Sequence, residues 1–173
     1  MLSIPATTWS VVVALAVVSA AIDLRTGRVP NVVTFGAALL ALGVHVVAGD
    51  PLWSLMGWIA GLALFLPLFA LGGMGGGDVK LLAAFGAWLG PIDAVWAALY
   101  AAVFGGVLAL AIGASHGYLR EACRNLFVML GTWRTAGLTT VPGVTLSDSR
   151  GPRLAYAVPI GLGALLALWL SPA

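Results

Sequence analysis

Long apolar runs separated by short polar breaks constrain this chain more than any other feature. The six runs are Thr8–Ile22, Asn31–Ala48, Leu52–Leu71, Val79–Leu89, Ala94–Ala114 and Leu154–Leu170. A bilayer core about 30 Å thick needs about 20 helical residues, and all runs but the fourth approach that length. Lipid offers the backbone no hydrogen-bond partners, so each run must form a helix. We therefore predict an all-α polytopic membrane protein, a bundle of about six transmembrane helices.

Composition agrees with a single membrane-embedded domain spanning residues 1–173. Hydrophobic residues make up 61% of the chain and charged residues 8%, whereas soluble domains carry about 25% charged residues. The net charge of +2 gives no reason to expect a nucleic-acid partner, so the lipid bilayer is the expected surrounding. No basic residue precedes Asp23, so a signal peptide is not expected and the first run is predicted to be a retained span.

The fourth run has a length problem that the other five do not have. Val79–Leu89 is too short to cross a bilayer alone, so it must be tilted, extended by the turn at Asp78 or sunk into the protein. We expect Pro91 to separate this run from the next one. The pairs Gly57 and Gly61, and Gly86 and Gly90, have the four-residue spacing that lets helices approach closely.

The charged residues test the predicted topology. The eight basic residues are Arg25, Arg28, Lys80, Arg120, Arg124, Arg134, Arg150 and Arg153, and in a six-helix arrangement they all lie on one side of the membrane. The opposite connections carry only Asp50 and Asp93. The positive-inside rule makes the basic side cytoplasmic and places the N-terminus outside.

Residues 115–153 are predicted to form a cytoplasmic loop that contains an amphipathic segment. Within Gly117–Arg134, apolar side chains recur at helical spacing, with basic and polar residues between them. This pattern predicts a helix that lies at the membrane interface or extends the fifth span. Thr135–Arg153 is rich in Thr, Ser, Gly and Pro and is predicted to be a flexible loop.

Two of the six acidic residues, Asp23 and Asp78, fall at the predicted cytoplasmic edge of apolar helices. Ionisable residues at membrane depth are candidates for function. A bundle can bring two such helix ends together, and two carboxyls sharing one proton can activate water and protonate a carbonyl oxygen. The alternative is that Asp78 only caps its helix.

The stretch GGMGGGDVK, residues 72–80, contains the glycines that precede Asp78. A phosphate-binding P-loop needs Gly-Lys followed by Ser or Thr, and this stretch lacks that sequence. A dinucleotide-binding turn needs Gly-x-Gly-x-x-Gly after a strand, which is also missing. The remaining alternatives are an interhelical loop and a loop that admits a peptide backbone close to Asp78.

These motifs resemble a known family. Asp23-x-Arg25 with Pro30-Asn31, followed by Gly75-x-Gly77-Asp78-x-Lys80, is similar to the type IV prepilin peptidases, membrane aspartic proteases of the GxGD class. The stretch from residue 153 to residue 165 also resembles the family's last helix. The chain has one cysteine, Cys123, and lacks the Cys-x-x-Cys domain of many members. It therefore resembles the short, peptidase-only form that serves Flp/Tad pili.

The resemblance implies the function of particular residues. Asp23 and Asp78 would be the catalytic pair, and a prepilin would be cut on the cytoplasmic side of the inner membrane. Supporting or substrate-binding residues would be Gly75, Gly77, Lys80, Arg25, Pro30 and Asn31. No cofactor or metal is expected, because His45 and His116 lie near opposite membrane faces. Asp78 lies at the start of a predicted helix, where the helix dipole favours negative charge, and Asp23 lies at the end of one, where it disfavours negative charge. We therefore predict that the shared proton resides mainly on Asp23.

Two alternatives stay open at this point. One is an archaeal preflagellin-type peptidase, which would use the same residues on another substrate. The other is a non-enzymatic transporter or assembly subunit, in which the aspartates would bind a cation or cap helices. The sequence favours no oligomeric state.

Overall fold

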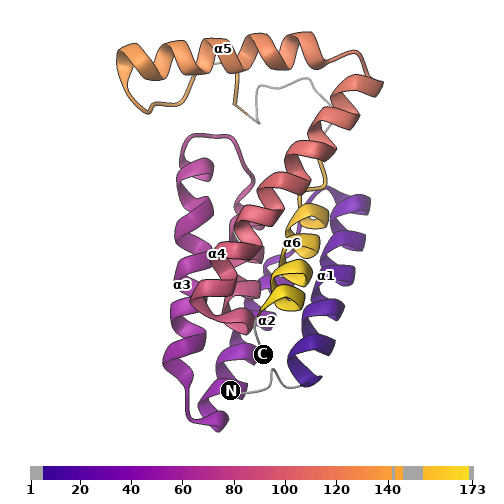
Figure 1. Cartoon of the computed structure of the whole chain (residues 1–173), viewed down its shortest axis with the longest axis vertical. Helices are drawn as coiled ribbons and strands as arrows, with labels where there is room; N and C mark the ends of the chain where they lie inside the picture. The colour runs from indigo at the N-terminus through magenta and orange to yellow at the C-terminus, as the bar shows by residue number, and fades with distance from the viewer. Residues whose placement is uncertain (1–5, 142, 146–153, 172–173) are drawn as a thin grey trace.

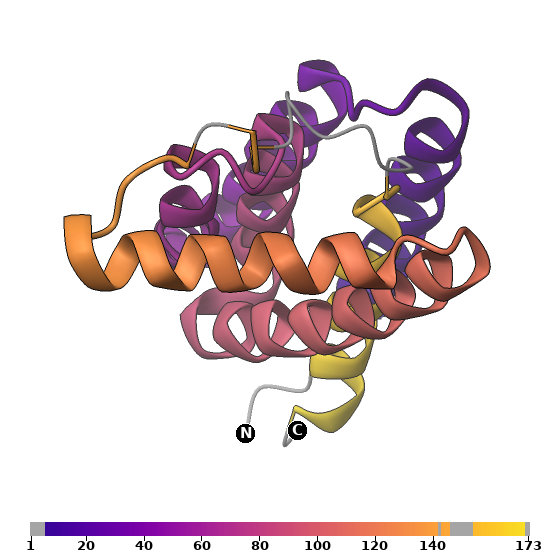
Figure 2. The ribbon, with the colours of Figure 1, turned by 90° about the horizontal axis from the view of Figure 1, so that it is seen from above.

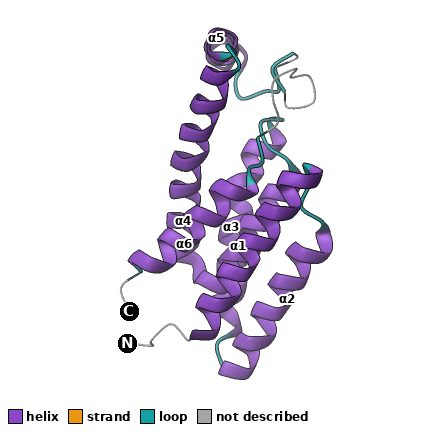
Figure 3. Cartoon of the chain, turned by 90° about the vertical axis from the view of Figure 1, so that its right-hand side faces the viewer, coloured by secondary structure: helices purple, strands orange, loops and turns teal. Residues whose placement is uncertain are grey.

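The computed structural model describes residues 6–141, 143–145 and 154–171. Within these residues the secondary structure is entirely helical (Figure 3). The helices are α1 (Ala6–Thr26), α2 (Asn31–Ala48), α3 (Pro51–Ala70), α4 (Gly76–Ser115), α5 (Leu119–Ala136) and α6 (Ala157–Leu170). The predicted all-α class is confirmed.

Helix α4 is two helices joined at a sharp break. Its 40 residues include Gly90, whose φ of 80° and ψ of 175° lie outside the helical region. The segment before Gly90 runs antiparallel to α3, and the segment after it runs antiparallel to α6 (Figure 1). The chain therefore reverses direction at Gly90. Gly90, and not the predicted Pro91, separates the two segments. Its positive φ is a conformation that glycine adopts without strain.

The first segment of α4 packs against α3 through glycines. A Cβ atom placed on Gly86 would collide with the carbonyl oxygen of Gly57, and one placed on Gly61 would come within 2.6 Å of the Leu82 carbonyl oxygen. The two backbones therefore touch directly, without side chains between them. The four-residue glycine spacing predicted this close approach, and the structure confirms it.

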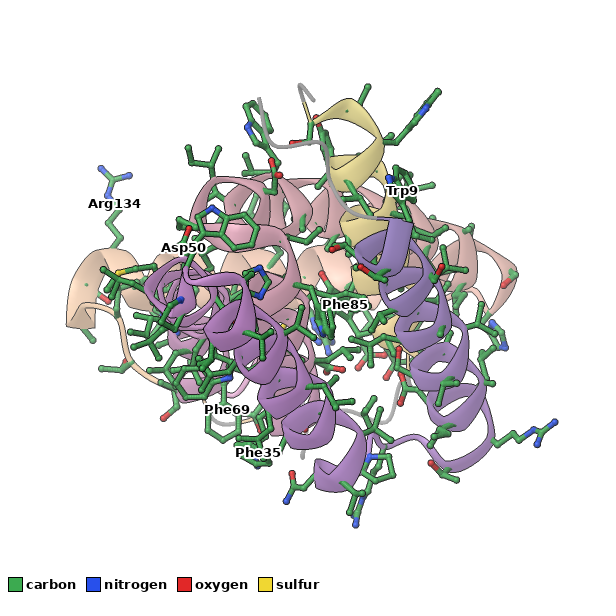
Figure 4. All side chains as sticks on the ribbon, turned by 90° about the horizontal axis from the view of Figure 1, so that it is seen from below. Trp9, Phe35, Asp50, Phe69, Phe85 and Arg134 are labelled. Atoms are coloured by element: carbon green, nitrogen blue, oxygen red, sulfur yellow. The ribbon has the colours of Figure 1, made fainter. Side chains whose placement is uncertain are left out.

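This segment forms the centre of the bundle. From Leu81 to Leu89 its residues are almost completely buried, and Phe85 is 0% exposed. Seen from below, Phe85 lies among the surrounding helices, whereas Arg134 points away from the bundle (Figure 4). From Gly76 to Leu89 the segment extends about 21 Å at 1.5 Å per residue. The short fourth run is thus both extended past Asp78 and sunk into the protein.

The outer surface has the apolar character expected of a membrane protein. Large hydrophobic side chains on α1, α2 and α3, such as Val17, Leu39 and Leu66, are exposed. Four helices, α1 to α4, are long and apolar enough to cross a membrane, and α6 is a shorter apolar helix of 14 residues. The described residues therefore have the fold of a multi-pass membrane protein.

Helix α6 fills the space between α1 and the second segment of α4. Gly161 lies against Ala16 of α1, and Gly163 lies against the backbone of Ala97 and Ala101 of α4. Because α6 runs antiparallel to both neighbours, its first residue lies at the end of the bundle where α1 ends. This arrangement determines what surrounds Asp23.

Several predicted boundaries differ by about one helical turn. Helix α1 continues to Thr26 instead of ending at Ile22, so Asp23 lies within its last turn. Helix α6 begins at Ala157 instead of Leu154, and the amphipathic helix runs from Leu119 to Ala136. Helix ends are the least specified part of a sequence pattern, because local contacts extend or shorten them.

The α1–α2 and α3–α4 connections and the start of α6 lie at one end of the bundle, which we call the site end. Helix α5 lies across this end, roughly perpendicular to the other helices (Figures 1 and 2). The site end carries the described basic residues: Arg25, Arg28, Lys80, Arg120, Arg124 and Arg134. Asp50 and Asp93 lie at the opposite end. Arg150 and Arg153 are outside the described residues.

Replacing Gly86 by alanine should destabilise the fold. Its methyl group would push against the Gly57 backbone, which cannot move aside as a flexible side chain can. Overpacking of this kind costs about 1–3 kcal/mol. The matched control is Gly106→Ala in the same helix, where a Cβ meets nothing within 4 Å. Denaturant unfolding in detergent should show the loss for Gly86→Ala alone, and equal stability of the two variants would contradict the packing account.

Candidate active site

Asp23 lies in the last turn of α1, with its side chain turned into the protein. Its exposed fraction is 6%. The helix ends at Thr26, and Gly27, with a φ of 65°, donates its N–H to the Asp23 carbonyl oxygen at 2.7 Å. The positive φ of Gly27 turns the chain away from the helix. The Asp23 side chain is therefore held in the protein, in the last turn of α1, and does not face water.

The carboxylate of Asp23 accepts a hydrogen bond from the start of α6. The backbone N–H of Ala157 donates to its Oδ2 atom at 3.1 Å. Ala157 is the first residue of α6, and the first N–H groups of a helix have no partner within the helix. The positive end of the helix dipole adds to this interaction. Asp23 thus caps α6 from a position 134 residues away in the sequence.

Asp78 lies in the first turn of α4, on top of the buried central segment. The N-cap residue is Gly75, without a side-chain cap, and the Asp78 N–H donates to the Gly75 carbonyl oxygen at 3.1 Å. The Asp78 carboxylate also interacts with the backbone of Gly75. A Cβ atom on Gly75 would lie 3.0 Å from Asp78 Oδ2. Asp78 is therefore not the N-cap that the alternative interpretation required.

The α1–α2 connection and the start of α4 meet directly. Gly77 lies against the backbone of Val29, where an added Cβ would be 3.5 Å from the Val29 carbonyl oxygen. Lys80 Nζ donates to Asn31 Oδ1 at 3.0 Å, and it lies 5.5 Å from the centre of the Phe35 ring. These contacts join the two motifs that the sequence separates by more than 40 residues.

Asp23 and Asp78 are close enough to interact electrostatically. The sequence predicted only that both lie at the same end of the bundle, and the fold brings the two acids into one site. Each carboxylate lies at the N-terminal end of a helix, Asp78 on α4 and Asp23 on α6. The helix-end argument that assigned the shared proton to Asp23 used its place in the last turn of α1 and left out the start of α6, so the position of the proton stays a prediction.

Tyr156 is a neighbour of the site that sequence reasoning did not select. It precedes Ala157, and its ring makes an edge-on contact with Phe65 of α3 at 6.4 Å between centroids. Its hydroxyl lies next to Gly105, where a Cβ would come within 2.6 Å. Burial, followed by the charge of Asp78, raises the pKa of Tyr156 above its usual value. Its place at the start of the last apolar run, Leu154–Leu170, was the available signal.

The other predicted supporting residues lie at the site end in different positions. Arg25 is exposed in the last turn of α1. Pro30 is the N-cap residue of α2, and its carbonyl oxygen accepts from Val33 and Thr34. Asn31 does not cap α2 with its side chain, which instead accepts from Lys80. Lys80 and Asn31 therefore tie α4 to α2 beside the two acids.

The described residues offer no group of three or more metal-binding side chains. His45, at the end of α2, stacks on Trp53 at 5.0 Å between ring centroids. His116 follows α4 at the site end, where its ring contacts Ser115 and the Ile112 carbonyl oxygen. The two histidines thus lie at opposite ends of the bundle.

Fold and site together define a class of protein: a multi-pass helical membrane protein with a buried and a partly buried carboxylate that interact beside a glycine-rich loop. Residues 10–110 match the model of the type IV leader peptidase family. The match covers more than half of the 173 residues, and the chain belongs to this family. It is accordingly a peptidase. No curated protein and no solved structure matches the chain significantly.

The contact between Asp23 and α6 generates a prediction about stability. Asp23→Ala removes the acceptor for the Ala157 N–H and should lower the free energy of unfolding by about 0.5–2 kcal/mol, the cost of losing a helix cap. Asp23→Asn keeps an oxygen acceptor and should lose less. Denaturant titration of the detergent-solubilised variants measures both values. If Asp23→Ala is as stable as the wild-type protein, the contact contributes nothing to the stability of the fold.

Proposed function

We propose that this chain is an aspartic endopeptidase that cleaves the leader peptide of type IV, Flp-like prepilins. The observation that carries the proposal is that Asp23 and Asp78 lie at the same end of the bundle, at the end of α1 and the start of α4. The two acids interact electrostatically although they lie 55 residues apart in the sequence. Membership of the leader peptidase family supplies the reaction class. The motif resemblance supplies the Flp-like substrate.

The two carboxyls would share one proton. The ionised carboxylate takes a proton from a water molecule, whose oxygen attacks the scissile carbonyl carbon. The protonated carboxyl donates its proton to the carbonyl oxygen, giving a neutral tetrahedral diol. When the carbon–nitrogen bond breaks, the protonated carboxyl gives its proton to the leaving amine. The other carboxylate takes a proton from one hydroxyl of the diol as the product carboxyl forms, so the pair again holds one proton. The reaction needs neither a metal nor an organic cofactor.

The glycines beside Asp78 suit an extended peptide substrate. Gly75 and Gly77 leave the approach to the carboxylate free of side chains, and Gly77 already lies against the Val29 backbone. A peptide backbone can therefore come near Asp78, where a side chain at Gly75 would crowd the carboxylate. Lys80 and Asn31 are placed to hold the start of α4 while the substrate enters.

We further propose that the protein lies in the bacterial inner membrane and that its active site faces the cytoplasm. The site end carries the described basic residues, and the opposite end carries Asp50 and Asp93. The positive-inside rule assigns the basic end to the cytoplasm. The N-terminus would then lie outside. This orientation suits a prepilin whose basic leader stays in the cytoplasm while its apolar helix lies in the bilayer.

Conservative replacement of either acid should abolish cleavage. Asp23→Asn and Asp78→Asn keep the side-chain shape but remove the ionisable group, so the leader-cleavage rate should fall at least about 100-fold. The measurement is mass spectrometry of an Flp-like prepilin co-expressed with each variant. Asp50→Asn at the opposite end and Cys123→Ser are the matched controls, and both should cleave normally.

If a folded Asp23→Asn variant cleaves at the wild-type rate, Asp23 only caps α6, and the proposal of a catalytic pair is wrong. If no prepilin is cleaved but an archaeal preflagellin is, the substrate assignment is wrong and the peptidase assignment holds. Wild-type protein that cleaves neither would favour a non-enzymatic transporter or assembly subunit.

Gly75→Ala should impair catalysis without unfolding the protein. The φ of −77° and ψ of 144° at Gly75 suit alanine, but its Cβ would lie 3.0 Å from Asp78 Oδ2 and shift the carboxylate by a few tenths of an ångström. Misplacing a reacting group on this scale should cost about tenfold in rate. The control is Gly73→Ala, whose Cβ makes an ordinary 3.5 Å contact with the Leu68 carbonyl oxygen. Equal cleavage rates in the two variants would refute this role for Gly75.

A further inference from the structure

Helix α5 has an apolar face that the rest of the described protein leaves uncovered. Cys123, Leu126, Phe127 and Leu130 follow the spacing of one face of a helix. All four are exposed, Phe127 to 75%. No residue of α5 is buried. An uncovered face of this kind is unfavourable in water.

A different edge of α5 contacts the protein. Met129 and Trp133, one turn apart, line a cavity of about 140 Å³ together with Leu68 and Leu71 at the end of α3. The Trp133 indole N–H donates to the Thr139 carbonyl oxygen at 2.9 Å. Figure 2 shows α5 lying across the site end. The edge of α5 with Met129 and Trp133 therefore faces the end of α3, whereas the exposed apolar face points elsewhere.

The charge of α5 indicates what covers that face. The helix carries Arg120, Arg124 and Arg134 against the single acid Glu121, which gives +2 from three basic residues and one acidic residue. Arg124 pairs with Glu121 at 3.5 Å, yet its side chain stays 70% exposed. A basic, amphipathic helix lying across the end of a membrane bundle has the composition of helices that bind anionic lipid surfaces.

We propose that α5 lies in the plane of the bilayer surface and binds anionic phospholipid, with Cys123, Leu126, Phe127 and Leu130 inserted among the acyl chains and the arginines on the phosphates. The proposal goes beyond the peptidase function and does not depend on it. A basic prepilin leader is a poor occupant because α5 has the same sign of charge. A second copy of the chain would bring two basic helices together, which is also unfavourable.

The position of α5 gives this lipid contact a consequence for the site. The cavity beneath Met129 and Trp133 is also lined by Gly73, which belongs to the loop that leads into Asp78. A helix anchored on the lipid surface therefore covers the outer side of this loop. Lipid binding would fix the depth of α5 relative to the membrane. It would thereby also fix the position of α5 over the glycine loop.

The single cysteine allows a direct test in the full chain. A nitroxide attached to Cys123 reports whether the apolar face meets lipid, through its relaxation by oxygen and by a water-soluble nickel complex. The matched position is Val128, exposed to 47% on the opposite side of α5, labelled as Val128→Cys in a Cys123→Ser background. The protein is reconstituted into phosphatidylcholine vesicles with and without phosphatidylglycerol.

We expect oxygen to relax the Cys123 label more than nickel does. We also expect nickel to relax the Cys123 label several-fold less than it relaxes the Val128→Cys label. Phosphatidylglycerol should increase this difference, and Arg120→Gln with Arg124→Gln should remove the increase. Arg28→Gln removes a charge at the same end outside α5 and should preserve it. A nickel-accessible Cys123 label overturns insertion into lipid, and a signal indifferent to phosphatidylglycerol overturns anionic recognition. A label immobile and shielded from both relaxants would instead indicate a second copy of the chain on this face.

Discussion

The direct backbone contact between α3 and the first segment of α4 is the constraint on which the rest of the structure depends. Gly57, Gly61 and Gly86 let the two helices approach without intervening side chains. This closeness lets a helical segment too short to cross a bilayer become the buried centre of the bundle. The segment needs no lipid contact of its own, because its neighbours cover it. Asp78 lies in the first turn of this segment, at the site end.

Helix α6 completes the site from the other side. It packs through Gly161 and Gly163 between α1 and the returning segment of α4. Its first N–H then meets the Asp23 carboxylate at 3.1 Å. The same carboxylate therefore has two functions in our account: it caps a helix, and it is one half of the catalytic pair. A fixed carboxylate is useful in catalysis because its position costs no further ordering.

The lengths of the apolar runs predicted the helices well because lipid leaves the backbone no alternative to intrahelical hydrogen bonds. The predicted range of α2 agrees with the structure, and that of α3 differs by one residue at each end. The fourth run was predicted to end at Leu89, directly before the break at Gly90, but the separation was attributed to Pro91. Pro91 can begin a helix, whereas the reversal itself required the positive φ of Gly90. The Gly90-Pro91 pair marks this reversal in the sequence, but only the backbone conformation shows that Gly90 makes it.

The sequence by itself determined the membrane class, the amphipathic character of α5, the grouping of basic residues at one end and the two aspartate motifs. Each follows from residue type and spacing along one chain. Only the tertiary structure decided that Asp23 meets the start of α6, that Lys80 bonds to Asn31 and that Tyr156 packs against Phe65. The Ala157 N–H that binds Asp23 is a backbone group, which every residue except proline carries. No residue pattern distinguishes it, so only packing could bring it to the site.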